Sequence, residues 1–181
     1  MSERIPFQAT EAMAPYADIE RLPVVLLLDN VRSMYNVGSF FRTADAAAIE
    51  RLVLGGITAF PPKRGITKTA LGAEERVAWE HHWEVMARAR ELRETGFELA
   101  AIETSTHAVD LFDWTPRWPV CVVFGHEVDG VRPELLALCD VHVRIPMLGK
   151  KHSLNVATAG GVVVYELLRK YRREREHRRA W

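Results

Sequence analysis

Polar side chains gather in three short segments of the sequence, each of which follows an apolar run of the kind that forms a buried strand. Residues 36–42 begin with an amide and end with the guanidinium of Arg42, and residues 125–130 place the carboxylate of Glu127 between two glycines. Residues 145–155 combine two lysines with hydroxyl and amide side chains. In open α/β sheets, ligands bind outside the carboxyl ends of the strands. The three segments therefore predict a polar ligand site at such an edge.

Two of these side chains also have ordinary structural explanations. On a helix, Arg42 can pair with Asp45 three positions later. The carboxylate of Glu127 can instead cap a helix that starts near Arg132, since Arg132 is followed by a proline suited to the first helical turn. The residues alone leave these explanations open beside a functional one.

The third segment is harder to explain by structure alone. Ser153 and Asn155 stand at the start of a long predicted helix, where backbone amides and polar side chains point toward the preceding loop and can bind a polar ligand. Gly160 and Gly161 follow in the helix interior, where each costs about 1 kcal/mol relative to alanine. We therefore expect the glycine pair to permit a close backbone approach, within the fold or across a dimer.

Several common catalytic and cofactor signatures are missing from the sequence. No G-x-G-x-x-G opens a helix, and residues 125–130 lack the Lys and Ser/Thr that complete a P-loop. There is no G-x-S-x-G elbow, and adjacent residues such as His152 and Ser153 do not face each other on a helix. His81 and His82 lack the i, i+4 partner of a helical zinc pair. The sequence argues against a Rossmann dehydrogenase, a P-loop NTPase and a serine hydrolase, and no metal site is expected.

Apolar runs alternate with segments of helical periodicity along the chain. Strands are expected at residues 24–29, 51–56, 97–103, 118–125 and 141–146, and helices at residues 36–49, 84–94, 132–139 and from residue 153 onward. Asn36 and Ser153 are the expected helix caps. Residues 58–82 contain a proline pair and no sustained period, so a long excursion with one short helix is expected there. This alternation predicts an α/β fold with a mostly parallel sheet flanked by helices.

Length and composition indicate one globular domain. The 181 residues are 48% hydrophobic and 27% charged, which is ordinary for a folded domain of this size. The longest aliphatic run, residues 24–28, is far too short to cross a bilayer, and the first residues lack the apolar stretch of a signal peptide. Cys121 and Cys139 provide no disulfide framework. A cytoplasmic protein with no membrane partner is therefore expected.

The net charge of zero conceals a polarised chain. Residues 169–181 contain seven cations and two acids, so the rest of the chain is correspondingly acidic. Binding to a polyanion follows local clusters of cations rather than the total charge. Cations near a helix C-terminus are also favoured by the helix dipole, which is an ordinary explanation for the same residues.

The three polar segments, in this order, resemble the signature motifs of the SpoU (TrmH-like) branch of the SPOUT RNA methyltransferases. They read Asn36-Val-Gly-Ser-Phe-Phe-Arg42-Thr-Ala, Phe124-Gly-His-Glu127-Val-Asp-Gly130 and Ile145-Pro-Met-Leu-Gly-Lys-Lys-His-Ser153-Leu-Asn155-Val-Ala. The similarity covers residues 22–170, and all three motifs in order are highly specific. His126 and the basic insert at residues 150–152 depart from the family pattern. No separate RNA-binding domain is recognised, so the resemblance indicates a minimal member with a single domain over residues 1–181.

The resemblance implies a fold, a cofactor and a partner that the residue patterns do not show. It implies an α/β sheet whose C-terminal segment is threaded into a trefoil knot, with S-adenosylmethionine bound in the knot of a homodimer. The implied reaction is methyl transfer to a ribose 2′-hydroxyl of tRNA or rRNA. The family's cofactor pocket corresponds to Ile102, Glu103, Thr104, Gly125, Ile145, Met147, Ser153 and Leu154.

The same resemblance assigns roles in catalysis and RNA binding. Arg42 matches the family's catalytic arginine, and Asn36, Glu127, Ser153 and Asn155 are expected to hold it and the target ribose. Because a guanidinium does not lose its proton in proteins, we expect Arg42 to orient the RNA phosphate and to stabilise the developing alkoxide rather than act as a base. The residues expected to contact RNA are Arg42, Lys150, Lys151, Arg172 and Arg173.

Two alternatives remain at this stage. One is a catalytically silent RNA-binding dimer that keeps the knot as a scaffold, and the other is a methyltransferase of the same fold that modifies an RNA base. A scaffold has no use for all five polar motif residues, which favours the enzyme. Recognition of the particular RNA is expected in residues 58–82 and at the two termini, which contain none of the motifs.

Overall fold

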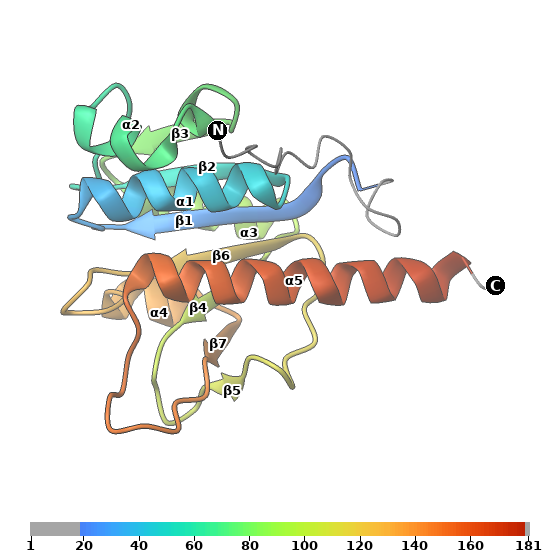
Figure 1. Cartoon of the computed structure of the whole chain (residues 1–181). Helices are drawn as coiled ribbons and strands as arrows, with labels where there is room; N and C mark the ends of the chain where they lie inside the picture. The colour runs from blue at the N-terminus through green and yellow to red at the C-terminus, as the bar shows by residue number, and fades with distance from the viewer. Residues whose placement is uncertain (1–18, 180–181) are drawn as a thin grey trace, which may run out of the picture.

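The apolar runs of the sequence form parallel strands, as predicted. In the computed structural model, which describes residues 19–179, seven strands pair in the order β3-β2-β1-β6-β4-β7-β5, and every pairing between them is parallel (Figure 1). The strands are β1 Leu22–Asp29, β2 Ile49–Gly55, β3 Trp79–His82, β4 Glu98–Ile102, β5 Val109–Asp110, β6 Val120–Phe124 and β7 Val141–Arg144. The helices are α1 Met34–Ala46, α2 Arg64–Ala70, α3 Val85–Glu94, α4 Pro133–Leu138 and α5 Val156–Arg179, with a 3-10 turn η1 at Ala73–Glu75. The predicted α/β class is confirmed.

Helices cover both faces of the sheet, which explains why its strands are apolar throughout. Side chains alternate along β1, so that Leu26 and Leu28 pack into a cluster with α1, α2 and α5. Val25 and Leu27 pack on the opposite face against α3 and α4. A strand that is buried on both faces needs a continuous apolar run rather than an alternating pattern. Ligand sites are consequently restricted to the strand ends and the sheet edges.

Helices α1 and α5 approach closely on one face of the sheet because Gly160 has no side chain. A Cβ atom added to Gly160 would lie 2.3 Å from Cε1 of Phe40, a buried residue of α1. The ring of Phe40 packs in turn against Phe124 of β6, with 5.0 Å between the centroids. The close approach predicted for the glycine pair is therefore found within the fold at Gly160. Its neighbour Gly161 has open space where a Cβ atom would lie.

Two helix starts differ from the sequence prediction. Helix α1 begins at Met34, where the hydroxyl of Ser33 accepts a hydrogen bond from the backbone N–H of Asn36, so Ser33 rather than Asn36 is the cap. Helix α5 begins at Val156, and the side-chain oxygen of Asn155 accepts hydrogen bonds from the second and third N–H groups of the helix. Asn155 therefore caps this helix in place of Ser153, because its side chain reaches the unsatisfied N–H groups.

Residues 58–82 contain more regular structure than predicted. Besides the expected short helix, α2, the segment forms η1 and the strand β3, which pairs with β2 at the edge of the sheet. Ile66 and Ala70 of α2 are buried in the core beside α1. Elements of three to seven residues are too short to show a hydrophobic period, so the sequence pattern could not separate them.

Two further expectations concern the chain as a whole. The threading of the C-terminal segment into a knot and the single domain over residues 1–181 both stay predictions, and residues 1–18 and 180–181 lie outside the described residues. Among residues 19–179, no helix is long and apolar enough to cross a membrane.

The contact at Gly160 generates a stability prediction. Gly160→Ala should lower the free energy of unfolding by about 1–3 kcal/mol, because the added methyl group overlaps the ring of Phe40. The control Gly161→Ala adds the same group to open space in the same helix and should raise stability by up to about 1 kcal/mol. Urea unfolding at one protein concentration measures both changes. Equal effects of the two substitutions would contradict the packing described here.

Candidate functional site

A cavity of about 750 Å³ lies at the carboxyl ends of β4, β6 and β7. The loops that follow these three strands form its walls, at the edge where the sequence predicted a ligand site. Its lining includes every residue expected in the cofactor pocket, namely Ile102, Glu103, Thr104, Gly125, Ile145, Met147, Ser153 and Leu154. Glu127 and Asn155 also line it. The fold thus brings together residues that are up to 53 positions apart in the chain.

A chain of hydrogen bonds joins the three polar segments beside this cavity, two of whose lining residues, Glu127 and Asn155, take part in it. The side-chain amide of Asn36 donates to Oε1 of Glu127 at 3.1 Å, and the amide of Asn155 donates to Oδ1 of Asn36 at 3.2 Å. Glu127 also accepts hydrogen bonds from the backbone N–H groups of Arg32 and Ser33, each at 3.0 Å. The start of α1, the loop after β6 and the start of α5 are therefore held in one arrangement.

Glu127 occupies the N-terminus of a different helix from the one expected. Its carboxylate accepts N–H groups at the start of α1, whereas the helix after Arg132 has no side-chain cap. Partial burial opposes ionisation of Glu127, but the hydrogen bonds from Arg32 and Ser33 outweigh it and hold the pKa of Glu127 below its usual value. An ionised carboxylate thus stands at this end of the cavity at neutral pH.

The loop after β6 is tightly closed, and its shape requires Gly125 and Gly130, the latter because its φ is +72°. The backbone N–H and C=O groups of His126 and Gly130 bond to each other at 3.0 Å, and a Cβ atom on Gly125 would lie 2.2 Å from the carbonyl carbon of Gly130. The carboxylate of Glu103 accepts a hydrogen bond from the N–H of Val131 at 3.1 Å. Glu103 therefore shapes the loop in addition to lining the cavity.

A buried ion pair supports the same region, and sequence reasoning missed it. Asp29, at the end of β1, is 2% exposed and accepts two hydrogen bonds from the guanidinium of Arg132 at 2.7 and 2.5 Å. The hydrogen bonds that Arg132 donates to the Asp29 carboxylate raise the pKa of Arg132. The signal in the sequence was Asp29 itself, a carboxylate that directly follows a buried apolar run and so needs a partner. The pair fixes the segment that leads into α4 relative to the end of β1.

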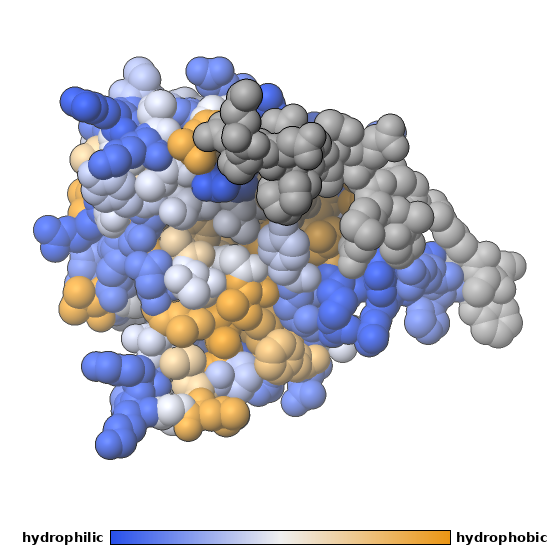
Figure 2. Space-filling view, in the orientation of Figure 1, coloured by the Kyte–Doolittle hydropathy of each residue, from blue (hydrophilic) through white to orange (hydrophobic). Residues whose placement is uncertain are grey.

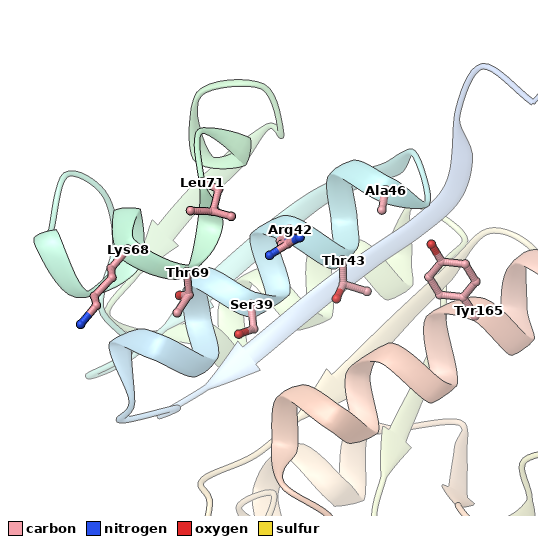
Figure 3. Close-up of a pocket in the computed structure, with 8 residues that line it drawn as sticks. All are labelled: Ser39, Arg42, Thr43, Ala46, Lys68, Thr69, Leu71 and Tyr165. Atoms are coloured by element: carbon pink, nitrogen blue, oxygen red, sulfur yellow. The ribbon is translucent and has the colours of Figure 1, made fainter. Parts of the chain in front are cut away.

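Arg42 lines a second, separate cavity of about 440 Å³, formed by α1, α2 and α5 (Figure 3). Its lining consists of Ser39, Arg42, Thr43, Ala46, Lys68, Thr69, Leu71 and Tyr165. The expected pairing with Asp45 is not found, since no ion pair or hydrogen bond joins the Arg42 guanidinium to another of residues 19–179. Lys68, Thr69 and Tyr165 were not predicted, because the segments that carry them have no motif.

The structure therefore divides the predicted catalytic residues between two places. Glu127, Ser153 and Asn155 line the first cavity, and Asn36 hydrogen-bonds to Glu127 and Asn155 beside it, whereas Arg42 lies on the second cavity. Asn36 and Arg42 are six positions apart on α1, which corresponds to roughly 9 Å along the helix axis and to a different side of the helix. Residue spacing alone could not show that the two side chains diverge.

The predicted RNA-binding cations lie at distant positions. Lys150 and Lys151 are exposed in the loop that leads into α5, beside the first cavity. Arg173 is exposed in the second half of α5, where its neighbour Arg172 lies 3.6 Å from Glu176. About 25 Å of helix separates the two groups, on the basis of 1.5 Å per residue. One RNA would have to extend along α5 to contact both.

Comparisons with known proteins point to one family. Residues 23–165 match the sequence profile of the SpoU rRNA Methylase family. A 23S rRNA (guanosine-2′-O-)-methyltransferase of Vibrio parahaemolyticus is 32% identical over 148 residues, which are 81% of this chain and 59% of that protein. The AdoMet-bound structure of an rRNA methyltransferase from Sinorhizobium meliloti is 29% identical with a TM-score of 0.73, covering 81% of this chain and 56% of the other. A structure described by its 2-OH methylation of C/U34 on tRNA is 28% identical with a TM-score of 0.74, covering 82% of this chain and 95% of the other.

Fold and site define an α/β protein with a candidate ligand cavity at the carboxyl ends of parallel strands. Within that class, the chain belongs to the SpoU rRNA Methylase family, whose profile spans most of its length. The chain spans about three fifths of the length of the curated relatives it matches.

The ionised Glu127 generates a pH prediction. Its pKa is lower in the folded protein, so its contribution to stability is present above the pKa of the unfolded chain and is lost as the pH falls through the folded value. Glu127→Gln should lower the free energy of unfolding by roughly 1 kcal/mol at pH 7, and the difference from the parent protein should vanish in strong acid. Urea unfolding across this pH range measures it. Glu75→Gln, at an exposed carboxylate, is the control, and a constant difference at all pH values would contradict the assignment.

Proposed function

We propose that this chain transfers a methyl group from S-adenosylmethionine to a ribose 2′-hydroxyl of tRNA or rRNA. The observation that carries the proposal is the cavity at the ends of β4, β6 and β7. The second and third motif segments line this cavity, and Asn36 of the first segment is joined to it by hydrogen bonds with Glu127 and Asn155. The relatives support it, since one is named for guanosine 2′-O-methylation and a solved neighbour contains AdoMet.

The residues of the cavity suit S-adenosylmethionine. A volume of about 750 Å³ is in the range of small-molecule sites. Ile102, Ile145 and Leu154 offer an apolar surface for the adenine, and the backbone groups of the glycine-bearing loop after β6 can bond to its polar edge. The carboxylates of Glu103 and Glu127 favour a ligand that carries positive charge, such as a sulfonium.

The reaction requires the chain to activate a weak nucleophile. Bound S-adenosylmethionine would supply an electrophilic methyl group, whose bond to sulfur breaks as its bond to the ribose oxygen forms, leaving a neutral thioether. The ribose hydroxyl loses its proton as it attacks, and the proton passes to the adjacent RNA phosphate and from there to water. Because a guanidinium is a poor base, the part of Arg42 is to bind the RNA phosphate and to stabilise the negative charge that develops on the hydroxyl oxygen. Lys68, in the same cavity, adds a second positive charge for the phosphate.

A homodimer would bring the two cavities together. Figure 2 shows apolar side chains gathered over the first half of α5 and toward β5, beside a hydrophilic second half of the helix. Val162, Val109 and Phe112 are exposed there, at 37%, 41% and 56%, and Gly161 leaves open space on α5. A second copy packed on this face would place the Arg42 cavity of one protomer near the cavity of the other that lies at the ends of β4, β6 and β7, where we propose that S-adenosylmethionine binds.

The compartment belongs to the same proposal. The cytoplasm suits a protein whose cysteines are free, as Cys121 and Cys139 are, and whose substrate is cellular RNA. Burial raises the pKa of the Cys139 thiol to about 12, so this cysteine is an unreactive packing residue.

Arg42→Ala tests the catalytic assignment. Methyl transfer to RNA from cells that lack the gene should fall at least about 100-fold, because the phosphate and the developing charge lose their partner. Binding of S-adenosylmethionine, measured by calorimetry, should change little, because Arg42 lies outside that cavity. Mass spectrometry of the digested RNA separates ribose from base methylation. Arg90→Ala, on an exposed part of α3, is the control, and full activity of Arg42→Ala would refute its role.

Val162→Glu tests the dimer. A charge in the centre of the apolar face of α5 should convert the protein to a monomer in sedimentation experiments, with methyl transfer lost and S-adenosylmethionine binding kept. Ala87→Glu introduces the same charge on exposed α3 and should leave the dimer intact. A Val162→Glu protein that stays dimeric would place the interface elsewhere.

A further inference from the structure

Four aromatic rings form a continuous cluster at the β3 edge of the sheet. Phe60 stacks against Trp79 with 6.1 Å between the centroids and 26° between the planes. Phe60 also lies 4.4 Å from His81, and His81 lies 4.8 Å from Trp83 in an edge-to-face arrangement. We call Phe60, Trp79, His81 and Trp83 the aromatic cluster. None of the motif segments contains any of its members.

The aromatic cluster is too exposed to be explained as core packing. Trp83 is 69% exposed and Trp79 is 37% exposed, whereas the large side chains of the core are fully buried. β3 pairs only with β2, so no other strand within residues 19–179 covers this edge (Figure 1). An exposed group of large aromatic side chains marks a binding surface in a folded protein.

Two of the four rings, Phe60 and His81, are also held in place by contacts within the chain. The ring nitrogen Nε2 of His81 lies 3.0 Å from the carbonyl oxygen of Gly56, which fixes the ring at the centre of the aromatic cluster. Phe60 is partly buried and packs against the hydrophobic core. A platform that is already rigid loses little conformational entropy on binding a flat ligand.

The charges around the aromatic cluster favour a polyanion. The ammonium group of Lys63 lies 5.9 Å from the ring centroid of Phe60. Alternation along β3 places Glu80 on the opposite face from Trp79 and His81, where Glu80 hydrogen-bonds to Arg88 at 2.7 Å. The strand's own carboxylate is therefore directed away from the rings and neutralised.

Helix α2 connects the aromatic cluster to the Arg42 cavity. Lys63, beside the rings, is the residue that precedes α2, and Lys68 and Thr69 of the same helix line the cavity that contains Arg42. About 8 Å of helix separates Lys63 from Lys68. The ammonium of Lys68 also lies 5.7 Å from the ring of Tyr35, which is 52% exposed. A strand of RNA whose phosphate lies at Arg42 can thus place a neighbouring nucleotide on the rings.

We propose that the aromatic cluster is a stacking platform for an unpaired base of the RNA substrate, close to the ribose that is methylated. The proposal rests on the proposed function, and it adds the kind of RNA that the site accepts: a single-stranded loop rather than a duplex. Bases splayed out of a loop stack on aromatic side chains, whereas the bases of an A-form duplex are stacked on each other and inaccessible. A protein strand pairing with the edge of β3 would use backbone groups along only four residues and would need no row of rings.

Binding of two labelled RNAs to the full chain tests the platform. One is a single-stranded RNA of mixed sequence, and the other is the same strand annealed into a blunt duplex. The parent protein should bind the single strand more tightly, with quenching of tryptophan fluorescence. Trp83→Ala should weaken binding of the single strand roughly 10-fold, within the range expected for one stacked base, and leave the duplex unaffected. Trp83→Phe should restore most of the affinity, because it keeps an aromatic face.

Two controls separate stacking from a loss of structure. Ile57→Ala removes an exposed apolar side chain near the same edge and should not change either affinity. S-adenosylmethionine binding should be equal in all variants. Unchanged affinity of Trp83→Ala for the single strand, or an equal loss of affinity for both RNAs, would overturn the proposal. If the affinity is unchanged, pairing of a protein strand with the edge of β3 becomes the favoured explanation.

The outcome is distinguishable from failure of the proposed function. A parent protein that methylates RNA, together with a Trp83→Ala variant whose KM for RNA is unchanged, would refute the platform alone. A parent protein that transfers no methyl group but loses its preference for the single strand in Trp83→Ala would refute the enzyme and keep the platform.

Discussion

The carboxylate of Glu127 is the group on which the arrangement of the site depends. It joins the loop after β6 to the first N–H groups of α1, where the helix dipole favours a negative charge, and to Asn36. Asn36 extends the connection to Asn155, which is 119 residues away in the chain and caps α5. Since each partner is itself the start of an element or a tight loop, the cavity walls are set by hydrogen bonds that form only in the folded protein.

The division of polar groups between two cavities follows from how α1 lies on the sheet. The first turn of α1, with Asn36, lies at the carboxyl ends of the strands. The side chain of Arg42 points from a different side of the helix toward α2 and α5. The cavity at the ends of β4, β6 and β7 is lined by loops that carry three carboxylates, Glu103, Glu127 and Asp129, whereas the Arg42 cavity is lined by the cations Arg42 and Lys68. These linings are the basis for proposing a compact cationic ligand in the first cavity and the backbone of a nucleic acid in the second.

Part of this protein could be predicted from sequence because local patterns decide it. The strands β1 and β6 are buried on both faces and are therefore uniformly apolar. Gly160 is unfavourable in a helix interior, so its presence predicted the close approach of another element. The three motif segments come directly after strands, so a parallel sheet places them at one edge. Residues 58–82 gave no such pattern, because α2, η1 and β3 are short and owe their structure to contacts with α1 and β2.

The sequence by itself determined the α/β class, the family motifs and a set of residues that line the cavity at the ends of β4, β6 and β7. The tertiary structure alone decided that Arg42 lies apart from that cavity, that Glu127 caps α1 rather than α4, and that Asp29 pairs with Arg132. It also decided that rings from residues 60–83 meet at one edge. The physical reason is that periodicity reports which face of an element is buried, whereas the direction of a polar side chain and its distant partner depend on how separate elements pack.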